Sequence, residues 1–450
     1  MTEGPLFRGI VLYTIPIILT GLLQLLFNAA DLVVVGRFCG SISVGAVGAT
    51  GAITTLVVSL FTGLSVGSGV TVAHAYGQKD WKTVHRTVHT TLPLAIVSGV
   101  ILTVIGVLFS KQLLMLMDTP ENVLELSSVY MKIYFAGMTF NMIYNFAAAI
   151  LRAVGDTKSP LMFLTLAGVL NVILNVIFVT LFHMNVAGVA LATTLSQGVS
   201  AALVVHALMN RTDACRLVLR EMRFYGAQIK KIVFIGLPSG INGAVYAISN
   251  VLIQSSVNSF GDIVVSGNAS AANIEGFVWV CLNSFMQTSL NFTAQNLGAG
   301  NFKRIKKTLW TCLGCVSAVG IFLGVTVYSL APHLLSIYIT DSADAIAYGI
   351  TRMTYICFPY FLCGIMDVTT GSLRGMGVSI APMIISIMGV CGIRIGWIYT
   401  IFQIERFHTL DSLYFSYPIS WTITFLVQLI VFIIIFNKKK KNAELLASLG

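Results

Sequence analysis

The sequence predicts an all-α integral membrane protein with twelve transmembrane helices, in two six-helix lobes related by a pseudo-twofold axis along the membrane normal. Three observations carry this prediction: the composition, the number of long apolar stretches and an internal repeat. Of 450 residues, 56% are hydrophobic and only 10% are charged, whereas a soluble protein has about 25% charged residues. The composition therefore predicts a polytopic membrane protein rather than a chain of soluble domains.

Twelve apolar stretches are long enough to cross a hydrocarbon core of about 30 Å. They cover approximately residues 9–36, 43–76, 88–110, 122–150, 159–183, 186–209, 229–259, 264–297, 307–331, 345–372, 379–402 and 412–436. The start of the chain, MTEGPLFRG, lacks a basic region followed by a small-residue cleavage site. We therefore expect no removable signal peptide.

The basic residues predict the orientation. With the N-terminus inside, most of the 27 Lys and Arg residues fall in the two tails and the even-numbered connections. By the positive-inside rule, both termini are expected in the cytoplasm, with the chain crossing the plasma (inner) membrane many times. This bias accounts for the net charge of +10, so no nucleic-acid partner is predicted. The run Lys438–Lys441 fits an anchor at an anionic membrane surface.

The first span combines a proline with a buried acid. It lies between Arg8 and Arg37, and a helix of that length, about 42 Å, tilts or projects beyond the bilayer. Asp31 lies well inside the apolar run, where an acid is costly and normally faces a protein interior or a water-filled pathway. Pro16 removes a backbone donor, so we expect the helix to bend there. This combination is typical of an ion-coupled transporter.

The two halves of the chain repeat. LRAVGDTKSP at 151–160 returns as LRGMGVSIAP at 373–382, and Pro16 returns as Pro238, both at an offset of 222. Because each half has an even number of spans, both enter the membrane in the same orientation, as in transporters with parallel repeats. The predicted organisation is a first lobe (1–210), a cytoplasmic linker (211–228), a second lobe (229–437) and a basic cytoplasmic tail (438–450).

The repeat also separates packing from chemistry, because positions needed for packing should appear in both halves. Polar residues of the first half lack polar counterparts: Asp31 corresponds to Ile253, Asn171 and Asn175 to Ile393 and Trp397, and Thr193 to Phe415. Charged residues of the second half likewise lack charged counterparts: Glu275 corresponds to Thr54, Asp367 to Asn145 and Arg394 to Val172. These unmatched residues are the candidates for function.

Several motifs together resemble one transporter family. They are Pro16 and Asp31, the AYGQKD end of the second span (75–80), its repeat partner TAQNLGAGN (293–301), the paired LRxxG motifs, and GVALAT at 188–193. Over essentially its whole length the chain resembles the multidrug and toxic compound extrusion (MATE) family, of the multidrug/oligosaccharidyl-lipid/polysaccharide flippase superfamily. The resemblance implies a two-lobed antiporter that expels amphipathic, often cationic compounds in exchange for H⁺ or Na⁺.

By this resemblance, the family's ion site falls on Asp31, Asn171 and Thr193. Asn175 stands where some relatives have a second acid, so H⁺ and Na⁺ both remain open. Asn171 and Asn175 are four residues apart, hence on one helix face. Their oxygens suit a hard cation such as Na⁺, and a single buried carboxylate equally suits a proton. The alternative is a polar cluster that only hydrogen-bonds the helices together.

The second half places three charged residues deep in apolar spans: Glu275, Asp367 and Arg394. These three are the candidates for the wall of a substrate cavity. We expect Asp367 and Arg394 to form an internal ion pair. An unpaired Glu275 would then attract a cationic substrate in a cavity of low dielectric. Arg352 lies near a predicted helix start and is expected at the membrane interface.

Three other functions compete with an antiporter. A lipid-linked oligosaccharide flippase shares the superfamily fold but would favour a basic cavity and often extra spans. A membrane enzyme would need a nucleophile or a metal cluster; Cys312 and Cys315 have no histidine nearby, so neither zinc nor any metal beyond Na⁺ is predicted. A channel would need no buried acid. We therefore expect a monomeric transporter without cofactors, whose partners are small amphipathic molecules and the lipid bilayer.

Overall fold

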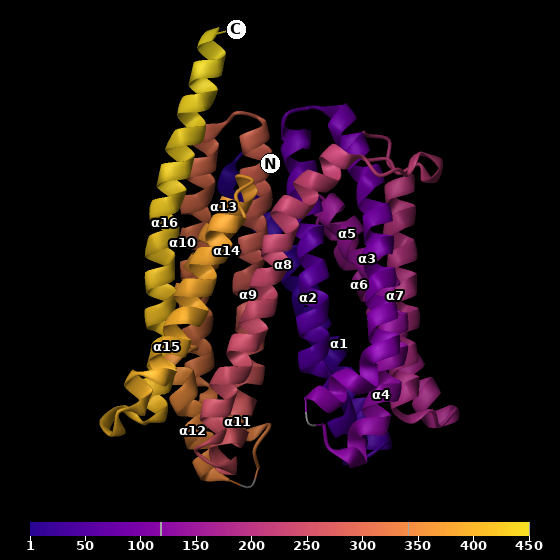
Figure 1. Ribbon diagram of the computed structural model, residues 1–450, viewed down its shortest axis with the longest axis vertical. Helices are drawn as coiled ribbons and strands as arrows, with labels where there is room; N and C mark the ends of the chain where they lie inside the picture. Colours follow the sequence, from indigo (N-terminus) through magenta and orange to yellow (C-terminus); the bar gives the residue numbers. More distant parts are fainter. Residues whose placement is uncertain (118, 341, 450) are drawn as a thin grey trace. The chain divides into compact units, whose positions relative to one another are not determined.

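The computed structural model describes residues 1–117, 119–340 and 342–449, and within these ranges every regular element is a helix (Figure 1). The first half contains α1 (Leu6–Phe38), α2 (Ser41–Gly77), α3 (Trp81–Leu116), α4 (Glu121–Ala136), α5 (Met138–Ala153), α6 (Lys158–Val176), the π-helix η1 (Ile177–Leu181) and α7 (Asn185–Met209). The second half follows a short 3₁₀ turn, η2 (Leu219–Glu221). It contains α8 (Gly226–Asn258), α9 (Asp262–Gly298), α10 (Phe302–Ser329), α11 (Ala331–Ser336), α12 (Ala343–Tyr355), α13 (Phe361–Gly375), α14 (Ile380–Ser386), the π-helix η3 (Ile387–Gly392), α15 (Ile393–Tyr399) and α16 (Leu410–Leu449), with 3₁₀ turns η4 (Ile401–Gln403) and η5 (Glu405–Phe407) before α16.

The predicted twelve-helix membrane fold is confirmed. Within the described ranges, nine helices are long and apolar enough to cross a membrane, and the pair α4–α5, bent by 46°, makes a tenth. The helix α9 and the pair α12–α13 complete the twelve segments. Many polar residues of α9, including Thr288, Asn291 and Asn296, are buried inside the protein rather than exposed, so this span is less apolar than a lipid-facing one.

Several spans are not single straight helices. The α4–α5 bend occurs at Gly137, and α12 and α13 are separated by a stretch that contains Pro359. Proline cannot continue the helical hydrogen-bond ladder, which explains a break there. Both α6 and α14 continue into π-helical turns, η1 and η3. π-Helical turns are rare in proteins overall, but those that do occur often lie at functional sites.

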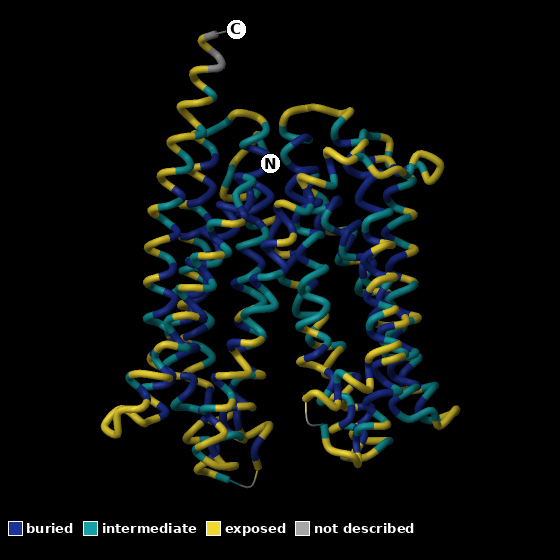
Figure 2. The backbone as a smooth tube through the Cα atoms, in the orientation of Figure 1, coloured by how far each residue is buried: buried dark blue, intermediate teal, exposed yellow. Residues whose placement is uncertain are grey.

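The helices form two compact units. One, here called the N-unit, comprises Ile15–Ala244; the other, the C-unit, comprises Met1–Thr14 and Val245–Gly450. In the N-unit, α5 is the central helix and packs against α2, α3 and α7; in the C-unit, α13 packs against α9, α10 and α16. Figure 2 shows that buried residues follow the inward faces of the helices within each unit. Because α1 and α8 contribute to both units, the predicted limits of lobes and linker, 1–210, 211–228 and 229–437, stay predictions.

The sequence repeat has a structural cause at the ends of α5 and α13. The glycines of the two LRxxG motifs, Gly155 and Gly377, have positive φ angles of 101° and 76°. The residue after each glycine donates its N–H to the carbonyl oxygen of the motif's leucine, at 2.9 and 3.1 Å. This is a helix-ending turn that glycine adopts without steric cost. The motif therefore stops the helix at the same place in each repeat.

The predicted basic tail continues the last helix. α16 runs without interruption through Lys438–Lys441 to Leu449, and Figure 1 shows its end extending beyond α10 and α13 of the same unit. Lys440 lies 3.6 Å from Glu444, one turn further on. Gly450, the last residue of the predicted tail, lies outside the described residues.

Candidate functional site

The four predicted ion-site residues meet in one hydrogen-bonded ring in the N-unit. Asn175 donates through Nδ2 to Oδ1 of Asp31 and also to Oδ1 of Asn171, the latter at 3.2 Å. Asn171 donates to the hydroxyl of Thr193 at 3.2 Å, and that hydroxyl donates to Oδ2 of Asp31 at 3.3 Å. Each carboxylate oxygen of Asp31 thus accepts one hydrogen bond. The ring joins α1, α6 and α7.

Local structure explains why these side chains converge. Asn171 and Asn175 lie one turn apart on α6, so both amides project from the same face. The π-helix η1 begins just after them. On α1, the ring of Phe27 packs over Gly168 of α6, where a Cβ atom would lie only 1.8 Å from the ring. The glycine therefore permits the close approach of α1 and α6 that brings Asp31 within reach of the asparagines.

The ring is nearly closed to solvent but is not fully satisfied. Asp31 is only 8% exposed and Asn175 is 0% exposed. Oδ1 of Asn175 has no hydrogen-bond partner among the described residues, and a buried acceptor without a partner often marks an ion, a proton or a water site. The ring therefore offers a carboxylate, two amide oxygens and a hydroxyl to one small cation.

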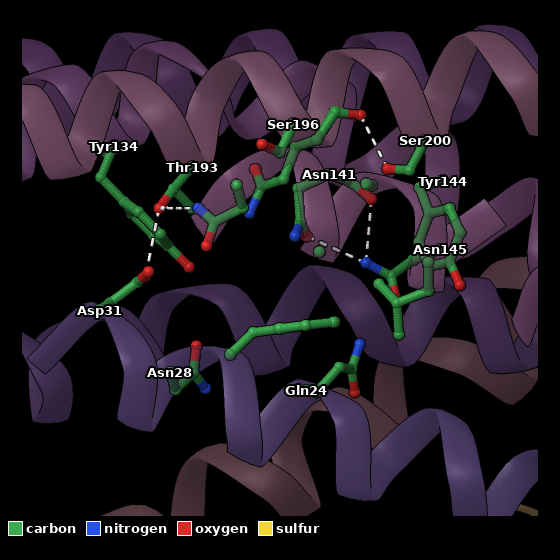
Figure 3. Close-up of a pocket in the computed structure, with 16 residues that line it drawn as sticks. Gln24, Asn28, Asp31, Tyr134, Asn141, Tyr144, Asn145, Thr193, Ser196 and Ser200 are labelled. Atoms are coloured by element: carbon green, nitrogen blue, oxygen red, sulfur yellow. Dashed lines mark hydrogen bonds between the residues drawn. The ribbon is translucent and has the colours of Figure 1, made fainter. Parts of the chain in front are cut away.

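A cavity of about 240 Å³ opens beside the ring, and Asp31, Asn171 and Thr193 are part of its wall. Figure 3 shows the carboxylate of Asp31 pointing toward Thr193 and Tyr134, with further amides along the wall. The remaining lining residues include Gln24, Phe27 and Asn28 of α1, Asn141, Tyr144 and Asn145 of α5, and Ser196, Gln197 and Ser200 of α7. Of the described side chains that line this cavity, Asp31 alone is charged.

Sequence reasoning missed most of these amides, although a signal was present. Gln24, Asn28 and Asp31 are spaced i, i+4 and i+7, which places them on one face of α1. Asn141 and Asn145 are spaced i and i+4 on α5 and hydrogen-bond each other at 2.9 Å. Polar residues at helical spacing inside an apolar span predict a polar surface that faces the protein interior.

Glu275, which was expected to be an unpaired acid, forms an ion pair in the structure. Arg352 of α12 donates two hydrogen bonds to Glu275 of α9, at 2.8 and 2.7 Å, and a third to Asn268 at 2.7 Å. The prediction of an unpaired Glu275 was wrong, because Arg352, itself only 9% exposed, is its partner. The interfacial placement of Arg352 stays a prediction. A buried carboxylate is costly without a partner, and only the three-dimensional fold supplied one.

The other two candidates of the C-unit are not paired with each other. Within the described residues no ion pair joins Asp367 and Arg394, so the predicted pair was wrong. Arg394 lies 3.8 Å above the ring of Tyr417 and donates from Nε to Ser420 at 3.0 Å. The aromatic face partly compensates the arginine's charge. Glu275, Asp367 and Arg394 are thus three separate features, and none of them lines the cavity of the N-unit.

Comparison with known sequences identifies the relatives of this chain. A family model described as MatE matches residues 16–177 and again 238–400. The chain is 27% identical over 393 residues to the probable multidrug resistance protein YpnP of Bacillus subtilis (strain 168), covering 87% of this chain and 88% of that protein. It is 26% identical over 447 residues to the probable multidrug resistance protein YoeA of the same organism, covering 98% and 96% of the two chains.

Solved structures share the fold. One, described as the outward-facing conformation of a multidrug resistance MATE family transporter of the MOP superfamily, matches with a TM-score of 0.91 at 22% identity. Another, a MOP superfamily transporter from Pyrococcus furiosus, matches with a TM-score of 0.91 at 21% identity. Each comparison covers 98% of both chains. At this level of identity the likeness shows a shared fold.

Proposed function

The chain belongs to the MATE family of transporters, and we propose that it is a secondary-active efflux antiporter that exchanges amphipathic, cationic compounds for H⁺ or Na⁺. The observation that carries this proposal is the closed ring of Asp31, Asn171, Asn175 and Thr193 in the N-unit. Two relatives of this chain, YpnP and YoeA, are named probable multidrug resistance proteins, and this supports the proposal that the chain exports drug-like compounds.

Proton binding at Asp31 would change the direction of hydrogen bonds in the ring. With the carboxylate ionised, Oδ2 accepts from the hydroxyl of Thr193. A proton on Oδ2 makes Asp31 a donor, so the Thr193 hydroxyl must accept and turn its own hydrogen elsewhere. Because Asp31 lies on α1 and Thr193 on α7, one proton alters how two helices are joined. The contact between α1 and α7 therefore differs between the protonated and the ionised form of Asp31. An ion-driven transport cycle needs such a difference, because an ion shifts a conformational equilibrium only if it interacts differently with the two states.

Sodium would use the same residues differently. Na⁺ needs oxygen ligands, which Asp31, Asn171 and Thr193 supply directly. Asn175 now presents its NH₂ group to Asp31 and has a spare oxygen, Oδ1. A rotation of this amide would turn the spare oxygen toward the ion. The two coupling ions therefore demand opposite roles of Asn175, donor for the proton-linked state and ligand for Na⁺.

The substrate preference is inferred from the cavity wall. Among the described residues, one acid and no base line it, and three aromatic side chains, Phe27, Tyr134 and Tyr144, accompany the acid. Aromatic faces and a carboxylate both attract organic cations. The paired Glu275 contributes no free charge, so the proposed preference for cations rests on Asp31. We also place the protein in the plasma (inner) membrane with both termini in the cytoplasm, acting as a monomer.

Membrane vesicles with separately imposed Na⁺ and pH gradients test the proposal. We expect one of the two gradients to drive export of a cationic dye by the wild-type protein. Asp31→Asn should abolish this export, because the amide can neither bind a proton nor carry the charge that holds Na⁺. The exposed acid Glu125, which contacts Lys111 at the surface, supplies the matched control Glu125→Gln, which should export normally at equal expression.

Two outcomes would refute the proposal. Full gradient-driven export by Asp31→Asn would remove Asp31 from ion coupling. Dye flux in wild-type vesicles that is independent of both gradients would exclude an antiporter of H⁺ or Na⁺.

A further inference from the structure

A cluster of two histidines and a glutamate lies apart from the ring and the cavity, within the N-unit. His85 and His89 are four residues apart on α3, and Glu221 belongs to the turn η2 between α7 and α8. One potential ligand atom from each of the three residues lies within 4.8 Å of the other two. Nε2 of His85 is 2.8 Å from Oε2 of Glu221. We propose that His85, His89 and Glu221 form a zinc-binding site that fastens the segment around η2 to α3.

The hydrogen bonds of His89 favour a metal-binding form of its ring. Nδ1 lies 2.8 Å from the carbonyl oxygen of His85; since a carbonyl only accepts, Nδ1 carries the hydrogen. The lone pair is then on Nε2. Metal-ligating histidines commonly have this arrangement, in which the other ring nitrogen donates to a carbonyl or carboxylate and fixes the ring.

The ligand types indicate the metal. Two imidazoles and one carboxylate are a frequent donor set for Zn²⁺, which takes four ligands at about 2.0–2.2 Å. Mg²⁺ and Ca²⁺ prefer oxygen and are poorly served by imidazole. The side chains of His85 and Glu221 are 39% and 54% exposed, so water can complete the coordination. Exposure also lets both side chains rotate toward an ion without disturbing the core.

Two features limit the affinity. Nε2 of His89 now accepts the N–H of Val218 at 3.0 Å, and an ion must displace that bond. Basic residues close in sequence also repel a cation. One of them, Arg86, is held against the ring of Tyr225, with its guanidinium carbon 5.4 Å from the ring centroid. The site therefore suits reversible binding of Zn²⁺ rather than a permanent structural centre.

The same segment is already held to α3 by several weaker bonds. Arg223 donates its N–H to the carbonyl oxygen of His89 at 3.2 Å, and Thr90 bonds Arg223 and Tyr225 at 3.3 Å each. A metal ion shared by His85, His89 and Glu221 would add a far stronger link between the segment and the helix. Bound Zn²⁺ should therefore stabilise the folded protein, because an ion that binds only the folded state raises its stability.

The test uses the full-length protein without a polyhistidine tag, stripped of metal by a chelator. Zinc binding is measured as stoichiometry after dialysis and as the shift of the thermal unfolding midpoint during a ZnCl₂ titration. We expect one Zn²⁺ per chain and a raised midpoint, with no shift on adding MgCl₂. His85→Ala and Glu221→Gln should each weaken zinc binding at least about tenfold. The matched control is His206→Ala, which removes an exposed histidine that bonds only Asn210 within the described residues.

Glu221→Gln guards against loss of folding, because it alters one exposed side chain and keeps its size. If the variants and the His206→Ala control bind zinc with equal stoichiometry and affinity, the site is refuted. It is equally refuted if Mg²⁺ raises the midpoint as much as Zn²⁺. The alternative, a plain ion pair between His85 and Glu221, predicts no saturable zinc binding by the wild-type protein.

Discussion

Arg352 and Glu275 are joined by two parallel hydrogen bonds, from Nε and Nη2 of the arginine to the two carboxylate oxygens. Asn268 extends the pair, because it accepts from Arg352 at 2.7 Å and from the hydroxyl of Tyr414 at 2.9 Å. The network connects α9, α12 and α16 inside the C-unit. Its charges cancel locally, so it acts on the fold rather than on substrate charge.

The first prediction concerns this pair. Arg352→Met leaves a buried carboxylate without a partner and should destabilise the protein by about 3–5 kcal/mol. The double variant Glu275→Leu/Arg352→Met removes both charges and should recover much of that loss. Thermal unfolding in detergent measures both. A double variant no more stable than Arg352→Met would contradict the idea that the unpaired charge is the cause.

The second prediction concerns Thr193 and its place in the hydrogen-bonded ring with Asp31. Thr193→Val keeps the shape of the side chain but removes the hydroxyl that donates to Asp31. A hydrogen bond to a charged group contributes about 1.5–3 kcal/mol, so we expect the ion concentration for half-maximal export to change by about tenfold or more. The control is Thr194→Val, because the Thr194 hydroxyl bonds the carbonyl oxygen of Ile133 instead. Identical ion dependence in the two variants would exclude Thr193 from the ion site.

The third prediction concerns the close packing of α2 against the first part of α8 within the N-unit. A Cβ atom on Gly63 would lie 2.2 Å from the backbone nitrogen of Gly240, and one on Gly240 would lie 2.2 Å from the carbonyl oxygen of Leu60. Backbone atoms cannot move aside as side chains do. Gly63→Ala and Gly240→Ala should therefore each cost about 1–3 kcal/mol or more.

Thermal unfolding and export assays of these two variants check the expectation. Gly51→Ala, also on α2, is the matched control, since a Cβ there meets nothing within 4 Å. If all three variants unfold at the same temperature and export equally, the contact between α2 and α8 does not constrain the protein.

The fourth prediction concerns pH and the segment after α7. Arg211 donates two hydrogen bonds to Asp213, at 2.9 and 2.6 Å, and this pairing holds the pKa of the Asp213 carboxyl below its usual value of 3.8. When folding lowers the pKa of a carboxyl, that carboxyl stabilises the protein at pH values above its pKa in the unfolded state. This contribution is lost as the pH falls through the pKa that the carboxyl has in the folded state.

Asp213→Asn should therefore lower the thermal midpoint at neutral pH. The gap between wild type and variant should stay constant down to about pH 5 and shrink below about pH 4. Glu405→Gln, at an exposed acid, is the control and should show no such gap. A gap for Asp213→Asn that persists unchanged below pH 3 would mean that the carboxylate charge is not its cause.

Hydropathy, charge bias and the internal repeat were enough to predict the membrane class, the number of spans and the presence of two lobes. These properties follow from the local order of residues, because a membrane span needs only enough consecutive apolar residues. Asp31 stood out for the same reason: its charge interrupts such a run. The repeat also marked Asn171, Asn175 and Thr193 as candidates, but their role in an ion site came from the family resemblance, since their spacing alone left a structural polar cluster equally open.

Only the tertiary structure decided which charged and polar residues are partners. Glu275 and Arg352 are 77 residues apart in the chain, and His85 and Glu221 are 136 apart. Hydropathy specifies that a segment crosses the membrane, but the rotation of each helix about its axis and its choice of neighbours follow from packing. For that reason the sequence by itself placed Asp31 in the protein interior correctly, left Glu275 without its partner and did not reveal the histidine–glutamate cluster.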